Sequence, residues 1–394
     1  MEPQPSRLRS QWFEGWFLRL IDHETSSSIA VIFGSLRRKD REPTAALADS
    51  PFDEHLIVIG YSDGRDGGGQ HEQRVLLDGP SVRLAGGGGP STSAGPRLSW
   101  WSDAHGGMVV DGNLLTLDLA LPDGMRLVAN ASGTRVPWDA RSPDTYGPEG
   151  WLSRTGLLPC HYFVHSFGSR TQYALWHRRN TQNNALWNRP TGIGSEAPLL
   201  IGEARTHVER NWGDSFPTGW VWAQAALPND SAYLVLTGGR FKIGPLTTDS
   251  YIIGLRAAPA AAEEGAGSSR RRALHWDFRT TDLDRVSDHR MPCDGRLAIN
   301  ATSRDGSRRI ELVLSAPPSS FGRPLHVPTS DRGFSDEPGC RESPVATVSI
   351  TAWERRFGDG GRGGDRPWWW REASPRLRAV VPLGVLEFGG GYRC

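Results

Sequence analysis

Long apolar runs are the first thing that the sequence lacks. No stretch approaches the roughly 18 apolar residues of a membrane span, and residues 1–10 contain no apolar core of the kind that a signal peptide has. The same ten residues are too short to form an organelle transit peptide. We therefore expect either a cytosolic protein or a sequence that lacks its leader.

The sequence also lacks a net charge and a basic block. Its 45 lysines and arginines nearly balance its 44 aspartates and glutamates, which leaves a formal net charge of +1. Lys39 and Lys242 are the only lysines, so almost all of the positive charge belongs to arginine. Because binding to the phosphates of nucleic acids needs a basic patch, we expect no nucleic acid partner.

Cysteine is scarce, and its spacing has no metal-binding or redox pattern. Cys160, Cys293, Cys340 and Cys394 lie far apart, and no pair has CxxC spacing. This arrangement indicates neither a zinc site nor a disulfide framework. We expect the four thiols to be reduced, as they are in a reducing compartment.

Glycine and tryptophan are abundant instead. The chain has 47 glycines and 16 tryptophans, whereas hydrophobic residues make up 37% of it. Each tryptophan buries a large apolar area, and sixteen exceed what packing usually requires, so we expect some of them to line a cavity. The 394 residues are enough for about two domains or for one very large β structure.

Short apolar runs separated by turn residues dominate the chain. Hairpin signals stand at Asp111-Gly112-Asn113, Pro122-Asp123-Gly124 and Asp305-Gly306, because glycine supplies the positive φ that tight turns need. The segment 376–381 is a marginal helix candidate. We predict an all-β fold of antiparallel sheets or barrels. The predicted strands are 28–33, 55–61, 108–110, 114–121, 125–129, 161–167, 172–176, 232–237, 240–243, 251–256, 273–279, 297–302, 309–315, 345–353 and 385–388.

Several segments between the predicted strands are typical of surface insertions. They are rich in glycine, serine, alanine or proline, and they cannot bury enough apolar surface to offset the entropy of ordering them. The segments are 63–69, 85–96, 259–272 and 358–366, and the region 317–344 is a long loop-like stretch with little periodicity.

The most informative segment is 209–224, which reads Glu-Arg-Asn-Trp-Gly-Asp-Ser-Phe-Pro-Thr-Gly-Trp-Val-Trp-Ala-Gln. It combines three tryptophans with two carboxylates, an asparagine and a glutamine, and it is broken by Gly213, Pro217 and Gly219. Flat apolar walls with a few polar groups that orient a ligand are typical of a binding pocket. The segment therefore predicts the wall of a pocket.

A second segment, Phe13-Glu14-Gly15-Trp16-Phe17-Leu18-Arg19, pairs with the first in a family resemblance. Together they resemble the signatures of the tocopherol cyclase family, in which FEGWY-like and EKNWG…FP…W.W.Q-like segments recur. Pro159-Cys160-His161 is a looser match to a Pro-His-Trp segment of that family, and residues 353–357 and 386–390 resemble its closing strands. The resemblance spans about residues 11–391.

The resemblance implies a fold and a reaction. The family is similar in architecture to carotenoid hydratases and to some fungal cyclases, which implies two lipocalin-like antiparallel β-barrel or sandwich domains, 1–215 and 216–394, with a cavity in or between them. It implies an isomerase-type intramolecular cyclase of vitamin E biosynthesis, which adds the oxygen of a prenylquinol to a prenyl double bond to form a chromanol ring. That reaction is redox-neutral and implies no cofactor. A plastid location follows if the source is a photosynthetic eukaryote.

Such a cyclase needs an acid that can protonate the alkene. Glu209 is the first candidate, Glu14 the second and Asp214 the third, because burial of a carboxyl group against indoles raises its pKa. The alternative is that these carboxylates pair with Arg210 or Arg19 and have a purely structural role.

His161 is a candidate proton relay or a base that positions the quinol, because imidazole titrates near neutrality. A hydrogen-bonded structural histidine is the alternative. His161 and His165 would share one face of a predicted strand, but no third ligand stands at a recognised spacing, so we expect no metal.

The same segments supply the candidate substrate-binding residues, which are Trp16, Asn211, Trp212, Trp220, Trp222 and Gln224. The π faces of the tryptophans would stabilise positive charge on a tertiary carbon. Trp220 and Trp222 would share one face of a strand, for which ordinary core packing is the alternative. Asn211 and Gln224 would hydrogen-bond a quinol hydroxyl or, alternatively, backbone groups at a sheet edge.

Two other functions fit the same residues. A lipocalin-like carrier of an isoprenoid or another lipid would use the same cavity without turnover, and a terpenoid hydratase or cyclase would use the same scaffold. In each case the expected partner is a hydrophobic small molecule, with no obligate protein partner. The Trp368-Trp369-Trp370 run is a candidate contact with a membrane or a lipid droplet, and packing between domains is the alternative.

Overall fold

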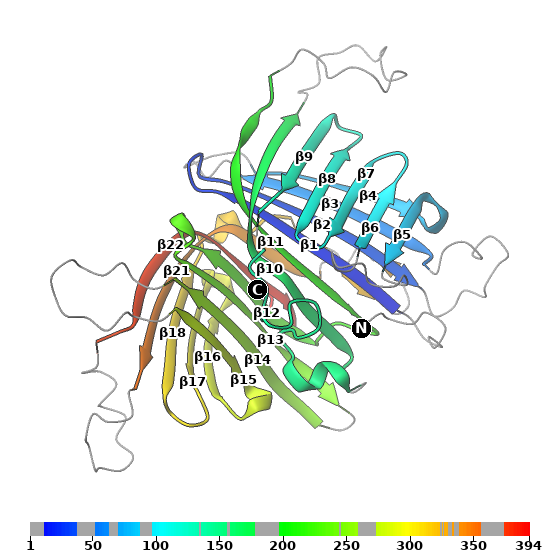
Figure 1. Cartoon of the computed structure of the whole chain (residues 1–394). Coiled ribbons are helices and arrows are strands. Elements are labelled where there is room, and N and C mark those ends of the chain that lie inside the picture. The colour runs from blue at the N-terminus through cyan, green and yellow to red at the C-terminus, as the bar shows by residue number, and fades with distance from the viewer. Residues whose placement is uncertain are drawn as a thin grey trace, which may run out of the picture.

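The computed structural model consists almost entirely of antiparallel strands (Figure 1). It describes residues 12–394 apart from 38–51, 63–69, 87–96, 134, 156–157, 178–196, 244–245, 259–272, 324, 326, 330–332, 335–338 and 356–373. The insertions expected at 63–69, 259–272 and 358–366, most of the one expected at 85–96, and the Trp368-Trp369-Trp370 run lie outside the described residues.

The first sheet is a meander of eleven strands whose first and last strands pair with each other. Its order, β4-β3-β2-β1-β11-β10-β9-β8-β7-β6-β5, leaves β4 and β5 at the two edges. The strands are β1 (Trp12–Asp22), β2 (Ser27–Arg37), β3 (Glu54–Ser62), β4 (Gln70–Asp78), β5 (Val82–Gly86), β6 (Arg97–Ser102), β7 (Gly106–Asp111), β8 (Leu114–Ala120), β9 (Met125–Ala131), β10 (Cys160–His177) and β11 (Leu200–Gly213).

The second sheet repeats this design with nine strands in the order β15-β14-β13-β12-β22-β21-β18-β17-β16. Again the first and last strands, β12 and β22, are neighbours. The strands are β12 (Gly219–Ala226), β13 (Ala232–Ile243), β14 (Leu246–Ala257), β15 (Leu274–Arg279), β16 (Arg285–Met291), β17 (Arg296–Thr302), β18 (Arg308–Ser315), β21 (Cys340–Glu354) and β22 (Leu377–Gly390), and a separate short pair consists of β19 (Pro328–Thr329) and β20 (Gly333–Phe334).

The helical elements of the described residues are short 3₁₀ turns. They are η3 (Gly79–Ser81), η4 (Gly150–Arg154), η5 (Pro228–Asp230), η6 (Thr280–Asp282), η7 (Pro292–Asp294) and η8 (Pro318–Ser320). Within the part of the chain that the structure describes, no helix has both the length and the apolar character to cross a membrane.

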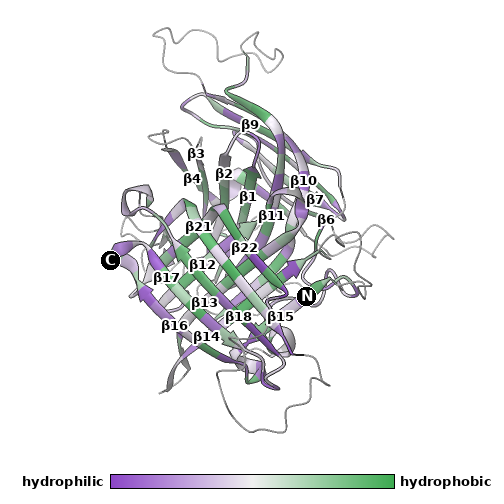
Figure 2. Cartoon of the chain, turned by 90° about the vertical axis from the view of Figure 1, so that its left-hand side faces the viewer, coloured by the Kyte–Doolittle hydropathy of each residue, from purple (hydrophilic) through white to green (hydrophobic). Residues whose placement is uncertain are grey.

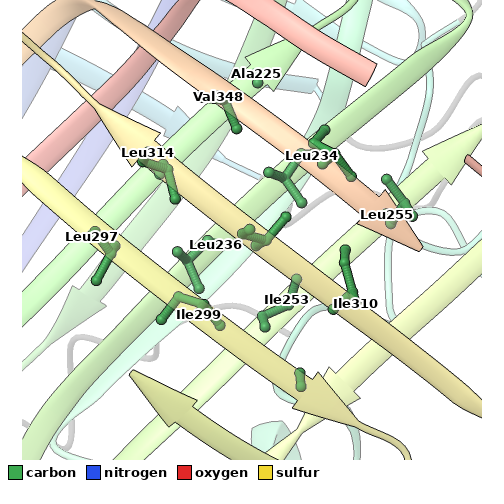
Figure 3. Close-up of a cluster of buried hydrophobic side chains, with 14 of the residues drawn as sticks. Ala225, Leu234, Leu236, Ile253, Leu255, Leu297, Ile299, Ile310, Leu314 and Val348 are labelled. Atoms are coloured by element: carbon green, nitrogen blue, oxygen red, sulfur yellow. The ribbon is translucent and has the colours of Figure 1, made fainter. Parts of the chain in front are cut away.

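Each sheet curls around its own hydrophobic core. In β8, for example, Leu115, Leu117 and Leu119 are buried while the residues between them are more exposed, as the period of two along a strand requires. Hydrophobic and hydrophilic residues alternate in the same way along the strands of the second sheet (Figure 2), and the core of that sheet is a separate cluster of aliphatic side chains (Figure 3). Two nearly closed, lipocalin-like sheets result, and the all-β prediction is confirmed.

The two sheets meet through their outer faces. In β1, Trp16, Leu18 and Leu20 belong to the core of the first sheet. The residues between them point the other way, and Phe17 packs against Trp222 of the second sheet. β1 and β12 thus each present one face to their own core and the other face to the opposite sheet.

Arg19 joins the two sheets at the centre of this interface. Its side chain is fully buried, and Nε donates to Ser28 Oγ at 3.1 Å. Nη1 donates to Gln224 Oε1 at 2.6 Å, and Nη2 donates to the carbonyl oxygens of Pro344 and Leu383, each at 3.0 Å. Burial lowers the pKa of Arg19 to about 9, and the nearby Glu342 opposes that change. A buried guanidinium with these acceptors fixes the position of one sheet on the other.

The three predicted hairpins are confirmed. Gly112, Gly124 and Gly306 have φ values of 58°, 86° and 69° and lie in the turns between β7 and β8, β8 and β9, and β17 and β18. The strands of the first sheet end at Gly213 and those of the second begin at Gly219. The division of the chain into domains 1–215 and 216–394 stays a prediction.

Two predicted strand breaks are wrong. Residues 161–167 and 172–176 belong to one continuous strand, β10, and residues 232–237 and 240–243 belong to β13. The glycines inside these strands do not form turns. They allow a side chain from another strand to pack directly against the backbone. A Cβ at Gly168 would lie 2.3 Å from Tyr233 Cε1, and one at Gly238 would lie 2.1 Å from Tyr251 Cδ1. β10 stays continuous, but its pairing with β11 shifts in register between Val164 and Ser169.

Two further predictions of element type need correction. The marginal helix at 376–381 is the beginning of β22, because pairing with β21 outweighs a weak local helix preference. The end of the loop-like region 317–344 is already part of β21, which starts at Cys340.

The expectation of four reduced thiols is wrong for one pair. Cys293 and Cys394 form a disulfide that ties η7 to the last residue of the chain. The two cysteines are 101 residues apart in the sequence, so no local spacing could indicate their proximity. Cys160 and Cys340 are free.

Candidate functional site

A cavity of about 370 Å³ lies between the outer faces of the two sheets. This volume is within the usual range of small-molecule sites, roughly 300–1,000 Å³. The first sheet contributes residues of β1, β2, β3, β10 and β11 to the lining, and the second contributes residues of β12, β13, β14, β21 and β22. The cavity that the sequence predicts in or between two domains therefore lies between the two sheets.

The segments that carry the family resemblance meet at this cavity. β1 and β11 pair so that Gly15 lies opposite Asn211 and Phe17 lies opposite Glu209. β12 and β22 pair so that Trp222 lies opposite Glu387. Strand pairing thus brings segments from the beginning, middle and end of the sequence to one wall.

Glu209 lines the cavity and has three polar partners on one carboxyl oxygen. Its Oε2 accepts hydrogen bonds from the Tyr162 hydroxyl at 2.5 Å and from Trp222 Nε1 at 3.1 Å. His207 Nε2 lies 2.8 Å from the same oxygen. Burial raises the pKa of Tyr162, and the Glu209 carboxylate raises it further, so this hydroxyl keeps its proton. These three partners hold one oxygen of the Glu209 carboxyl group in a fixed position.

Glu342 and Glu387 also line the cavity, and sequence reasoning missed both as site residues. Glu342 of β21 and Glu387 of β22 lie directly opposite each other across the two strands, and such neighbours have Cβ atoms about 5 Å apart. Both side chains are half-buried. Like charges at this spacing oppose simultaneous ionisation, so the pair favours a shared proton.

Burial is the main cause of a raised pKa at both groups. It raises the pKa of Glu387 to about 7, with a further contribution from Glu209 and opposition from hydrogen bonds with Trp220 and Cys340. It raises the pKa of Glu342 to about 8, with a further contribution from Glu387 and opposition from Arg19. The pair can therefore hold a proton near neutral pH.

Aromatic side chains form the walls beside these carboxyl groups. Trp220 donates its indole N–H to Glu387, and Phe17 contacts Trp222 edge-on with ring centroids 4.9 Å apart. Trp220 lies flat against Gly389, where a Cβ would lie only 1.9 Å from indole Cε2. The absence of a side chain at Gly389 therefore sets the position of this wall.

Glu14 and Trp16 lie along the cavity lining, but they are held by partners of the first sheet. Glu14 Oε1 accepts a hydrogen bond from Trp16 Nε1 at 2.9 Å and lies 3.0 Å from Arg210 Nη2. The Arg210 guanidinium also lies over the rings of Trp16 and Trp212, 5.3 and 4.9 Å from their centroids. This arrangement has the geometry of the structural alternative, in which Glu14 is a paired charge.

The other candidates from the sequence occupy different positions. Asn211 lines the cavity, and its side chain lies across Gly15. Gln224 is buried and accepts its hydrogen bond from Arg19. Asp214 is exposed in the connection between the sheets.

His161 and Trp212 stack on each other with ring centroids 5.3 Å apart, outside the lining of the cavity. His161 Nδ1 lies 3.0 Å from Glu149 Oε2, and Glu149 does line the cavity. His161 thus reaches the site only through Glu149.

Some of the missed residues had a signal in the sequence. Glu387 stands inside the segment 386–390, which resembles a closing strand of the family, and Tyr162 follows His161 directly. Glu342 had none, because it lies in the region that was expected to be a loop. Among the described residues, no group of three or more potential metal ligands comes together.

The fold and the site define a class of protein: a two-sheet, lipocalin-like β protein with a ligand cavity between the sheets. A crystal structure of CghA with Sch210972 has the same fold, with a TM-score of 0.54 and 10% identity over 96% of this chain and 88% of that one.

Sequence comparison finds a family to which part of the chain is similar. Residues 196–364 match the family described as tocopherol cyclase-like. The chain is 26% identical over 196 residues to a chloroplastic tocopherol cyclase of Zea mays, and 24% identical over 193 residues to a probable chloroplastic tocopherol cyclase of Oryza sativa subsp. japonica. Each alignment covers 48% of this chain and 34% of the relative, so the chain matches about a third of the length of these relatives. The matched part of the chain is thus similar to the tocopherol cyclase-like family.

Proposed function

We propose that this protein is an intramolecular cyclase that closes a chromanol ring on a prenylated quinol. In this reaction a proton adds to one carbon of the prenyl double bond, the phenol oxygen bonds to the other carbon, and the phenol proton leaves. The sum is an isomerisation that needs no oxidant or reductant. The family match and the chemistry of the cavity support this proposal.

The observation that carries the proposal is the convergence of Glu209, Glu342 and Glu387 on one Trp-lined cavity. Cyclisation needs one carboxyl group that supplies a proton and one carboxylate that accepts a proton. The facing pair Glu342 and Glu387 favours a retained proton, and hydrogen bonds from Tyr162 and Trp222 hold the carboxyl group of Glu209 in position to accept one.

We therefore assign the proton donor to Glu387 and the acceptor of the phenol proton to Glu209. This revises the role that the sequence suggests for Glu209, which is that of the acid. The hydrogen bonds from Tyr162 and Trp222 orient the accepting carboxylate, and the bond from Trp220 orients Glu387.

The reaction also needs a group that stabilises positive charge on carbon, and the aromatic walls of the cavity can supply it. Protonation of a trisubstituted alkene leaves positive charge on a tertiary carbon, and the face of an indole attracts such a charge. Trp220 and Trp222 lie on β12, which pairs with β22. Each indole is close to a carboxyl group of the site, because Trp220 donates to Glu387 and Trp222 donates to Glu209. A cation that forms beside these carboxyl groups would also be close to a π face.

Incubation of the purified protein with a phytyl-substituted benzoquinol under reducing conditions tests the proposal, with the product measured by chromatography and mass spectrometry. We expect a chromanol of the same mass as the quinol, and we expect Glu209→Gln to reduce its formation while the matched variant Glu311→Gln on β18 retains it. If Glu209→Gln keeps full activity, the role of Glu209 is wrong. If the quinol co-purifies or binds but is recovered unchanged, the cavity is that of a carrier.

A further inference from the structure

A second, smaller cavity of about 70 Å³ adjoins the first. The two share the side chains of Phe17, Ile32, Leu325 and Glu342 as a common wall. Glu342 is the only carboxyl group among these four residues, so it is the titratable link between the two spaces. The lining of the smaller cavity includes the polar side chains of Ser28, Glu72 and Glu342, and a cavity of this volume has room for water, which needs on the order of 10–15 Å³.

The smaller cavity extends from Glu342 toward the protein surface. Glu72 of β4 and Arg323 also line it, and Arg323 is exposed. The charged groups that act on Glu342 are Glu387, Arg19, Glu209 and Glu72. Water that reaches the Glu72 side of the cavity can therefore exchange protons with Glu342 without passing through the larger cavity.

The proposed cyclisation creates a need for such a route. After each turnover Glu387 has lost a proton to the alkene carbon, and Glu209 has gained the phenol proton. The next turnover requires that a proton reach Glu387 and that one leave Glu209. While substrate or product fills the larger cavity it excludes water from it, and during that time the side of Glu342 offers Glu387 a separate source of protons.

We propose that Glu342 is the proton-uptake residue of the site, which takes a proton from water in the smaller cavity and passes it to Glu387. Glu209 releases its proton to solvent when product leaves the larger cavity, so one proton enters and one leaves in each cycle. This inference rests on the proposed cyclisation for its purpose, but the proton path itself can be measured without substrate.

The substrate-free test uses infrared spectroscopy of the whole protein at neutral pH. We expect a band of a protonated buried carboxyl group in the wild type, which Glu387→Gln weakens. After rapid mixing with D₂O the band should shift quickly in the wild type and in the control Glu311→Gln, and at least about tenfold more slowly in Glu342→Gln. Absence of the band, or an unchanged exchange rate in Glu342→Gln, overturns the proposal.

A second variant keeps the test decisive if Glu342→Gln does not fold. Ala30 lines the smaller cavity but not the larger one, so Ala30→Leu should fill the path and slow the same exchange while Glu342 stays in place. Unchanged exchange in a folded Ala30→Leu protein contradicts the route.

With a quinol that the wild type cyclises, rapid-mixing kinetics give a further readout. In Glu342→Gln we expect one product molecule per protein at nearly the wild-type rate, followed by steady-state turnover at least about tenfold slower. A slow first turnover would mean that Glu342 serves the chemical step instead. If Glu342→Gln slows proton exchange but the wild type cyclises no quinol, the proton path through Glu342 is supported and the proposed cyclisation is wrong.

Discussion

At the scale of single residues, three of the glutamates that line the cavity have different surroundings. Glu209 is held by Tyr162, His207 and Trp222, whereas Glu342 and Glu387 lie opposite each other on paired strands. Environments that push carboxyl groups toward opposite protonation states are a general means of dividing acid and base roles. The residue type alone does not distinguish these roles.

The first prediction concerns Glu387. Replacement Glu387→Gln removes the proton donor but keeps the side-chain shape, so we expect cyclisation to slow by roughly 10²- to 10⁴-fold with an unchanged melting temperature or a higher one. In the wild type the rate should fall as the pH rises through about 7, because deprotonation inactivates this acid. A rate that instead rises through this range would contradict the assignment.

The second prediction concerns stability and pH. Glu342 and Glu387 have raised pKa values in the folded protein, about 8 and about 7, against 4.5 for the ordinary carboxyl group. Between these values the folded state binds more protons than the unfolded state, so stability decreases as the pH rises. We expect the urea midpoint to fall from about pH 5 to about pH 8.5, and to fall less in the double variant Glu342→Gln/Glu387→Gln. An equal fall in both proteins would show that other groups cause it.

At the scale of strands, much of the fold could be predicted from the sequence. Alternation of apolar residues, as in β8, and glycines that adopt positive φ, as at Gly112, are local features, and the corresponding strands and turns follow from them. The wrongly predicted strand breaks lie at residues whose role depends on contacts with other strands. Gly168 and Gly238 resemble turn residues, yet each makes room for a tyrosine ring that comes from another strand.

The site was predictable only in the segments that carry the family resemblance. The aromatic wall lies on β12, which is one of those segments. Glu342 becomes part of the site because β21 pairs with β22, and that pairing is a property of the sheet. Its carboxyl group faces Glu387, which is 45 residues further along the chain, so no local pattern could indicate it.

The third prediction tests the contact between β12 and β22. In Gly389→Ala the new Cβ would meet the Trp220 ring, and overpacking of this kind costs roughly 1–3 kcal/mol. We expect a lower melting temperature together with reduced ligand binding, because Trp220 must move into the cavity. Gly306→Ala is the matched control, since no atom lies within 4 Å of its Cβ position and only the left-handed backbone of Gly306 is penalised. Normal ligand binding by Gly389→Ala would contradict the proposed wall.

At the scale of the whole molecule, the function depends on how two similar sheets are joined. Each sheet closes on its own first and last strands, and each encloses its own core. The space that remains between their outer faces becomes the cavity. This differs from a ligand site inside a single barrel, because the relative position of the two sheets sets its shape.

The fourth prediction therefore concerns Arg19, which links the sheets. Arg19→Met would leave Gln224 and two carbonyl oxygens without this donor, and each buried acceptor that stays unsatisfied costs roughly 1–3 kcal/mol. We expect a clear decrease in the free energy of unfolding, measured with urea, and loss of ligand binding. Arg83→Met is the control, because Arg83 is 70% exposed and pairs only at the surface. Equal effects of the two substitutions would refute the role of Arg19.

The central claim is that a proton passes from the protein to a prenyl carbon while the ring closes. The most direct measurement is the mass of the product that purified wild-type protein forms from a phytyl-substituted benzoquinol in D₂O under reducing conditions. We predict a chromanol that carries one deuterium on carbon, at the position next to the new C–O bond. Recovery of unchanged quinol from folded protein, or a chromanol without deuterium on carbon, would contradict the account.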